Sequence, residues 1–251
     1  MTRPAPSRRD EMLREMGIHP RWHLRAAAPA AGTEVAAAPA AGAVPEAPVP
    51  TPPAVSGPGW EELKARVASC TACGLHAKRN KTVFGVGDEQ ADWLFVGEGP
   101  GADEDAQGKP FVGQAGKLLD NMLAAIDLRR GANVYIANIV KCRPPGNRNP
   151  EPEEAQACSS HLQRQIELLR PKLIVALGKV AAVNLLGRDA SIAALRGQVH
   201  EHRGIPLIVT YHPAYLLRTL NDKAKAWQDL RFAVDTMNGL QEEAAARAGA
   251  V

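Results

Sequence analysis

The amino-acid sequence predicts an α/β protein, a three-layer αβα sandwich built around a mostly parallel, four-stranded central sheet. Short apolar runs alternate along the chain with longer segments whose apolar residues recur at helical spacing. This alternation is typical of parallel sheets that helices cover on both faces. The part of the chain with this pattern spans roughly 180 residues, which is enough to bury one core.

The first half of this pattern contains two helices and two strands. Residues 60–68 read as a short amphipathic helix, and the apolar run 93–96 as a buried strand that ends in the turn GEGPG. Residues 115–126 have apolar side chains at helical spacing. A second apolar run, 133–140, predicts the next strand.

The second half repeats the alternation. Residues 152–169 predict a long helix and 173–177 a third strand. A helix over 179–186 opens after Gly178, and the strand predicted over 207–211 ends at His212. A last helix is predicted over 224–237.

The remaining segments differ in composition. Residues 26–58 are rich in alanine and proline, which predicts a disordered linker, and residues 59–240 are predicted as the folded domain. Residues 1–25 combine a helix start with apolar groups and suggest a docking peptide, and 241–251 read as a flexible tail. No apolar run has the ~20 residues needed to span a bilayer. A net charge of +3 by itself says little about nucleic acid.

The chain contains four cysteines. Cys70 and Cys73 form a CxxC motif, and the segment RPPGNRNPEPEEAQA separates Cys142 from Cys158. The N-terminus is charged and does not read as a secretory signal, so we expect a reducing compartment in which disulfides are rare. The cysteines then indicate a metal site or a redox pair. Their spacing leaves zinc and an iron–sulfur cluster both open, beside the plainer possibility of ordinary buried thiols.

Ligands of such sheets bind beyond the carboxyl ends of the strands, where the sequence places Glu98, Asn138 and His212. Glu98 lies in a glycine-rich turn, where it can either activate water or be an ordinary exposed turn residue. Asn138 can read a base edge or make a structural hydrogen bond, and His212 can donate to a developing anion or pack structurally. Phe111, in a glycine-rich loop, can stack on a flat ligand or fill the core.

Three ordered motifs carry a resemblance. The segments GEGPGADEDAQGKPFVGQAG, NIVKCRPPGNRNP and HPAYLLR, with CxxC upstream, closely resemble the family 4 uracil-DNA glycosylases over about residues 60–234. The resemblance implies removal of uracil from DNA by hydrolysis of the N-glycosidic bond, leaving an abasic site. It also implies a [4Fe-4S] cluster, with a structural role favoured, on Cys70, Cys73, Cys142 and Cys158. The alternative is a noncatalytic iron–sulfur or zinc protein that binds uracil or DNA.

The resemblance also implies roles for single residues. Glu98 matches the catalytic carboxylate and His212 the imidazole that faces a uracil oxygen. The remaining uracil-binding positions are matched by Gly99 in the turn, Glu104 near C5, Phe111 as the stacking platform and Asn138 at the base edge. DNA contacts are expected from Leu217, Arg218, Lys141, Arg143 and Arg148.

Uracil-containing DNA, single- or double-stranded, is therefore the expected partner, and the protein is expected to be a monomer in the bacterial cytoplasm, associated with the nucleoid. Residues 7–25 are in addition similar to the amino-terminal peptide of the psi subunit of the DNA polymerase III clamp-loader assembly. This similarity predicts a contact with the clamp loader or replisome, and no contact with a membrane is expected.

Overall fold

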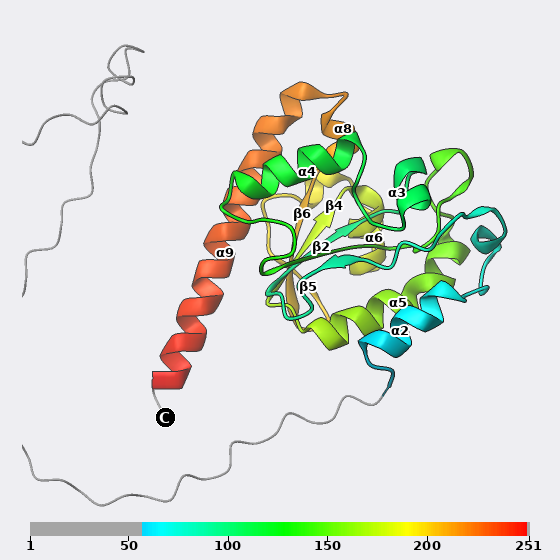
Figure 1. The fold of residues 1–251 in the computed structure, drawn as a ribbon. Coiled ribbons are helices and arrows are strands. Elements are labelled where there is room, and N and C mark those ends of the chain that lie inside the picture. The colour runs from blue at the N-terminus through cyan, green and yellow to red at the C-terminus, as the bar shows by residue number, and fades with distance from the viewer. Residues whose placement is uncertain (1–56, 250–251) are drawn as a thin grey trace, which may run out of the picture. The chain divides into compact units, whose positions relative to one another are not determined.

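The computed structural model describes residues 57–249, and a six-stranded mixed sheet lies at the centre of this part of the chain (Figure 1). The strands run in the order β1-β3-β2-β4-β6-β5. Their bounds are β1 Val86–Gly87, β2 Trp93–Gly97, β3 Val134–Asn138, β4 Leu173–Leu177, β5 His200–His202 and β6 Ile205–Thr210. The four central strands are parallel to one another, whereas β1 and β5 pair antiparallel at the two edges.

Helices lie against both faces of the sheet, as the sequence predicted (Figure 1). α4 and α9 pack on one face, and α2, α5 and α6 on the other. The α-helices are α2 Trp60–Ala68, α3 Ala102–Gln107, α4 Gln114–Ala124, α5 Pro152–Leu169, α6 Lys179–Leu186, α7 Ile192–Leu195, α8 Pro213–Leu216 and α9 Lys223–Gly249. Short 3₁₀ turns cover Gly74–Lys78, Pro145–Asn147 and Leu220–Asp222.

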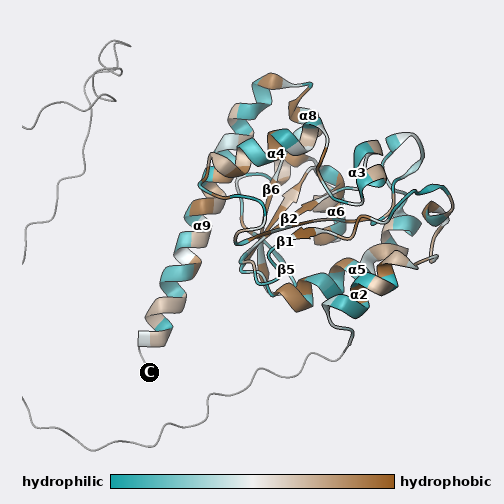
Figure 2. Cartoon of the chain, viewed as in Figure 1, coloured by the Kyte–Doolittle hydropathy of each residue, from teal (hydrophilic) through white to brown (hydrophobic). Residues whose placement is uncertain are grey.

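Strand β2 shows how one sequence run serves both faces. Leu94 and Val96 belong to the core beneath α5, whereas Trp93 and Phe95 belong to the core beneath α4 and α9. All five residues of the strand are buried, which explains why the run is apolar throughout rather than alternating. The strands are accordingly hydrophobic along their length, and hydrophilic residues gather on the outer faces of the helices (Figure 2).

Two features differ from the sequence prediction. The sheet has six strands instead of four, because β1 and β5 are only 2 and 3 residues long and carry no apolar pattern by which they could be recognised. The flexible tail predicted from residue 241 is also wrong, since α9 continues to Gly249. Its last turns consist mainly of alanine, glutamate and arginine, which favour helix, and Arg247 lies 3.7 Å from Glu243 one turn earlier.

Several predictions concern residues outside the described part. The docking peptide at 1–25 and nearly all of the linker at 26–58 precede residue 57, where the description begins. Among residues 57–249, no helix combines the length and the apolar character needed to cross a membrane.

Candidate active site and cysteine site

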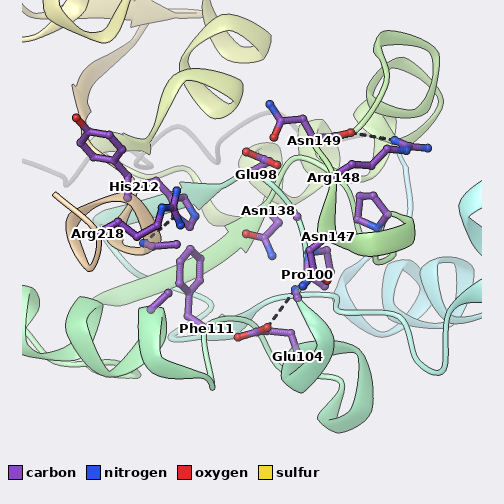
Figure 3. Close-up of a pocket in the computed structure, with 16 residues that line it drawn as sticks. Glu98, Pro100, Glu104, Phe111, Asn138, Asn147, Arg148, Asn149, His212 and Arg218 are labelled. Carbon is purple, nitrogen blue, oxygen red and sulfur yellow. Dashed lines mark hydrogen bonds between the residues drawn. The ribbon is translucent and has the colours of Figure 1, made fainter.

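A cavity of about 450 Å³ opens at the carboxyl ends of the parallel strands (Figure 3). It gathers all six residues predicted for catalysis and uracil binding, together with Arg148 and Arg218. The lining residues are Glu98, Gly99, Pro100, Gly101, Glu104, Phe111, Ala115, Asn138, Pro144, Asn147, Arg148, Asn149, His212, Ala214, Tyr215 and Arg218. Tyr215, Asn147 and Asn149 were not predicted, although each lies within a motif that the sequence singled out.

Asn138, the last residue of β3, presents an amide to this cavity. Its side chain is only 2% exposed, and its Oδ1 finds no hydrogen-bond partner among the described residues. Gly97 faces it across the sheet in the register of β2 and β3. A Cβ atom at Gly97 would lie 2.5 Å from Oδ1 of Asn138 and 2.6 Å from Cζ of Phe111, so the missing side chain leaves a slot between the amide and the ring. A buried, unsatisfied amide oxygen beside such a slot indicates a ligand that supplies a donor.

Phe111 forms one wall of the slot. Its ring is 6% exposed, and its centroid lies 5.6 Å from that of the His212 imidazole at an interplanar angle of 31°. The ring belongs to the core beneath α4, as one sequence interpretation had it, and it also lines the cavity, so stacking on a ligand stays a prediction. A flat ligand can stack on such a face.

His212 caps the N-terminus of α8, where its Nδ1 accepts a hydrogen bond of 3.1 Å from the backbone N–H of Ala214. Nε2 therefore carries the proton of the neutral ring and can donate. Burial lowers the pKa of His212 to about 4, the nearby charge of Arg218 acts in the same direction, and Glu104 opposes them. The imidazole is thus neutral near pH 7. Gly178 at the end of β4 makes room for it, since a Cβ there would lie 2.9 Å from that of His212.

Glu98 directly follows β2 and lines the cavity opposite Phe111 (Figure 3). Its carboxyl group is half-buried, and burial raises its pKa. The raised pKa makes the group a better base than an exposed glutamate. A carboxylate beside a slot for a flat ligand can orient water or stabilise positive charge.

Glu104 lines the same cavity but is held more firmly than the sequence suggested. One carboxylate oxygen accepts from the N–H of Gly101 at 3.0 Å, and the other from those of Val112 and Gly113 at 2.9 and 3.1 Å. The side chain therefore connects the turn after β2 with the loop that carries Phe111. Its geometry supports a role in holding this wall of the cavity, beside its expected position near C5.

The residues predicted to touch DNA differ in where the structure places them. Lys141 is a wrong prediction, because its side chain is 1% exposed and its Nζ donates to the backbone oxygen of Asn138 at 2.9 Å and to Gln165 at 2.6 Å. Leu217 is 42% exposed beyond α8, and Arg218 lines the cavity. Arg148 also lines it, with its guanidinium bound by both oxygens of Glu154 at 2.8 and 2.7 Å.

Arg143 is partly exposed and donates to Asn147 Oδ1 at 2.7 Å. This bond and the pairing of Arg148 with Glu154 hold the loop after β3 against α5. Both arginines therefore shape the rim of the cavity, whatever contact they make with a phosphate.

The four cysteines meet at a second, smaller cavity, which we call the cysteine site. Cys142 and Cys158 are buried there, and Cys70 and Cys73 are partly exposed. Burial raises the pKa of the Cys142 thiol and that of Cys158, the latter to about 11. No three of the described histidine, cysteine and acidic side chains are grouped as the ligands of one bound ion would be. The convergence of all four thiols from three segments nevertheless provides a donor set for a metal or cluster.

N–H groups point at the sulfur atoms of the cysteine site. Arg79 donates to Cys142 Sγ at 3.1 Å and to the backbone oxygen of Cys70 at 2.8 Å, and the backbone N–H of Lys141 donates to Cys158 Sγ at 3.3 Å. His161 Nε2 lies 3.3 Å from Cys70 Sγ. Such donors favour thiolates over thiols. The sequence missed Arg79 and His161 because their contacts span 63 and 91 positions of the chain.

Comparison with known proteins gives a consistent result. Residues 84–231 match the family model described as the uracil DNA glycosylase superfamily. The chain is 47% identical to a type-4 uracil-DNA glycosylase of Archaeoglobus fulgidus over 165 residues, which cover 62% of this chain and 82% of that protein. It is 46% identical to a protein of the same description from Thermotoga maritima over 167 residues, covering 66% and 86%. A type-5 uracil-DNA glycosylase of Pyrobaculum aerophilum is 33% identical over 228 residues, covering 76% and 95%.

Proposed function

The chain belongs to the uracil DNA glycosylase superfamily, as a type-4 uracil-DNA glycosylase, and we propose that the cavity at the strand ends is where it takes the base. The enzyme excises uracil from DNA as a step of repair: it hydrolyses the N-glycosidic bond, releases free uracil and leaves an abasic site. A glycosylase reaches this bond only after the nucleotide has left the stack, at a cost of ~a few kcal/mol. The cavity must therefore supply contacts that offset this cost.

The observation that carries the proposal is the orphaned amide of Asn138 beside the ring of Phe111. Uracil fits this pair because its N3–H can donate to Oδ1 and its O4 can accept from the amide nitrogen, while its face stacks on Phe111. Cytosine has an acceptor at N3 and a donor at N4, so both bonds would fail. An unpaired buried amide then costs ~1–3 kcal/mol.

His212 supports departure of the base. As the N-glycosidic bond breaks, negative charge gathers on the uracil ring, and its O2 can accept from Nε2–H of the neutral imidazole. The tautomer needed for this donation is the one that the N–H of Ala214 selects at Nδ1. A neutral donor stabilises the anion without protonating it beforehand.

Glu98 acts on the sugar side of the bond. Its carboxylate can hold the attacking water, accept its proton and stabilise the positive charge that develops on the sugar. The half-buried position of the group supports this role, because desolvation strengthens it as a base.

The decisive experiment measures release of free uracil from a synthetic oligonucleotide. Glu98→Gln should reduce the single-turnover rate by about 10²–10⁴-fold, the range for a positioned acid–base group, and His212→Asn by about 10²–10³-fold, the range for one oxyanion donor. The exposed Glu62 offers a matched control for the carboxylate, since Glu62→Gln should leave the rate unchanged. Binding without release by the unaltered protein would instead support a noncatalytic uracil- or DNA-binding protein.

The proposal includes a [4Fe-4S] cluster held by the four residues of the cysteine site. Support comes from the convergence of every cysteine of the chain on one cavity, from the N–H donors aimed at the sulfurs of Cys142 and Cys158, and from the ring nitrogen of His161 beside that of Cys70. When bound, the cluster would tie together the segments that carry its ligands, a structural role. Protein purified without oxygen should be brown, with about four iron and four sulfide per chain. A colourless protein loaded with zinc would contradict the cluster.

Residues 7–25, outside the described part, carry the proposal of a clamp-loader contact, which rests only on the similarity of the sequence to the psi subunit. Such a contact would bring a monomeric repair enzyme in the bacterial cytoplasm to newly copied DNA. Full-length protein should retain clamp-loader subunits in a pull-down, and Leu13→Ala with Trp22→Ala should abolish retention. Equal retention by the altered chain would remove this part of the proposal, and sedimentation would test the monomer.

A further inference from the structure

Phe111 has a strained backbone. Its φ angle is 53°, in the left-handed region that residues with a side chain seldom adopt. Conformations of this kind are unfavourable and persist only where surrounding groups impose them. The strain turns the Phe111 ring toward the cavity, so the groups that impose it also determine where the stacking platform lies.

One side of the constraint is the first turn of α4. A Cβ atom at Gly116 would lie 1.8 Å from the carbonyl oxygen of Phe111, so the loop rests directly on the helix backbone. Only glycine permits this approach. This contact with Gly116 prevents the loop that carries Phe111 from moving toward α4. It does not prevent the loop from moving away from the helix.

The other side is Arg130, which lies outside the cavity in the connection between α4 and β3. Its Nη1 donates to the Pro110 carbonyl at 2.8 Å and its Nη2 to the Phe111 carbonyl at 2.9 Å. Its Nε and Nη2 also donate to Oδ1 of Asp120, on α4, at 3.1 and 2.9 Å. The planar guanidinium thus ties two successive carbonyls of the strained loop to the helix beneath it.

We propose that Arg130, oriented by Asp120, is a positioning residue that sets the stacking platform for uracil by holding Phe111 in its left-handed conformation. The proposal rests on the proposed function of Phe111. Hydrogen bonds from a charged donor are stronger than neutral ones, and two of them act on the two residues where the backbone turns. Without them the loop can relax to an ordinary φ angle, and the ring leaves its place beside Asn138 and His212.

The test replaces Arg130 by methionine, which keeps a long apolar stem and removes every donor. Loss of a base-stacking contact predicts a decrease in kcat/KM of about 5- to 100-fold on a uracil oligonucleotide, and weaker inhibition by free uracil. Arg130→Lys keeps a charged donor and should recover much of this loss. The neighbouring exposed Arg129→Met is the matched control and should behave as the unaltered enzyme.

A double-mutant cycle shows whether Arg130 acts through Phe111. In a Phe111→Leu background, Arg130→Met should change kcat/KM by less than about twofold, because the platform is already lost. An equal loss in both backgrounds, or no loss in either, overturns the proposal. If Arg130→Met fails to fold, Asp120→Asn should give a smaller loss with the same dependence on Phe111.

A second readout does not depend on catalysis. Arg130→Met should accelerate amide hydrogen exchange at Val112 and Gly113, whose N–H groups donate to Glu104 in the same loop. Faster exchange in a chain that releases no uracil would refute the proposed function and leave the positioning role intact. Unchanged exchange in an active enzyme would refute the positioning role alone.

Discussion

Replacing Gly97 by alanine is expected to close the slot between Asn138 and Phe111. The new methyl group would lie 2.5 Å from Asn138 Oδ1 and 2.6 Å from Phe111 Cζ, well inside ordinary contact distance. Because both neighbours are buried, one of them must move, and either movement removes a contact that uracil needs. The change therefore tests the slot without altering any group that takes part in the chemistry.

The size of the effect can be estimated from the two contacts. Stacking of a base on an aromatic ring contributes ~1–3 kcal/mol, and one hydrogen bond ~0.5–1.5 kcal/mol. Loss of one of these contacts from the transition state lowers kcat/KM by roughly 2- to 160-fold, and loss of both by roughly 10- to 2,000-fold. Overpacking costs ~1–3 kcal/mol of folding free energy, which in a domain of this size lowers the Tm by about 2–12 °C.

The assay is single-turnover release of uracil at a temperature well below the Tm of the variant, beside a thermal melt. Gly239→Ala provides the control, since a Cβ there meets nothing within 4 Å and alanine favours the helix in which it lies. It should keep full activity with an equal or higher Tm. An alanine at position 97 that leaves kcat/KM within twofold of the unaltered enzyme would refute the account of the slot.

Four further predictions concern pH, DNA and the cysteines. Activity should fall on acidification as Glu98 takes up a proton at its raised pKa, and this acid limb should vanish in Glu98→Gln. Because the pKa of His212 is about 4 in the folded protein and 6.5 in a free side chain, the free energy of unfolding should decline as pH falls between these values, and less so in His212→Asn; equal slopes would contradict this. Leu217→Ala should slow release from duplex more than from single-stranded DNA, with Leu220→Ala, at another exposed leucine, as control, and equal losses would remove the proposed wedge. Cys158→Ala should yield colourless protein with a lower Tm, whereas a brown variant would exclude Cys158 as a ligand.

Much of the fold could be predicted because long periodic segments determine their own structure. The helix predicted over 152–169 and the strand predicted over 173–177 have the observed bounds. Proline at the start of α5 and a left-handed residue, Arg170, at its end mark both limits. The edge strands could not be predicted, because two or three residues show no period and their pairing depends on distant partners.

The cavity could be predicted to the extent that strand ends meet at one edge of a parallel sheet. Asn138, Glu98 and His212 follow from that rule alone, and the cavity brings them together. The strained angle at Phe111 could not be predicted, since it results from contacts with Gly116 and Arg130 that only the folded chain makes. A cluster of basic residues in the sequence likewise does not reveal which of them are buried. For this reason Lys141 was wrongly predicted to contact DNA.

The buried ammonium of Lys141 links two sites that differ in chemistry. Its Nζ donates to the carbonyl of Asn138, while burial lowers its pKa to about 8 and negative charge on Cys158 acts in the opposite direction. A lineage that gave up the cysteines would leave this cation enclosed without a counter-charge, an arrangement that costs several kcal/mol. Position 141 should therefore change together with the cysteines among descendants of such an enzyme, and an uncharged residue there would mark, in sequence alone, a glycosylase that has lost its cysteine site.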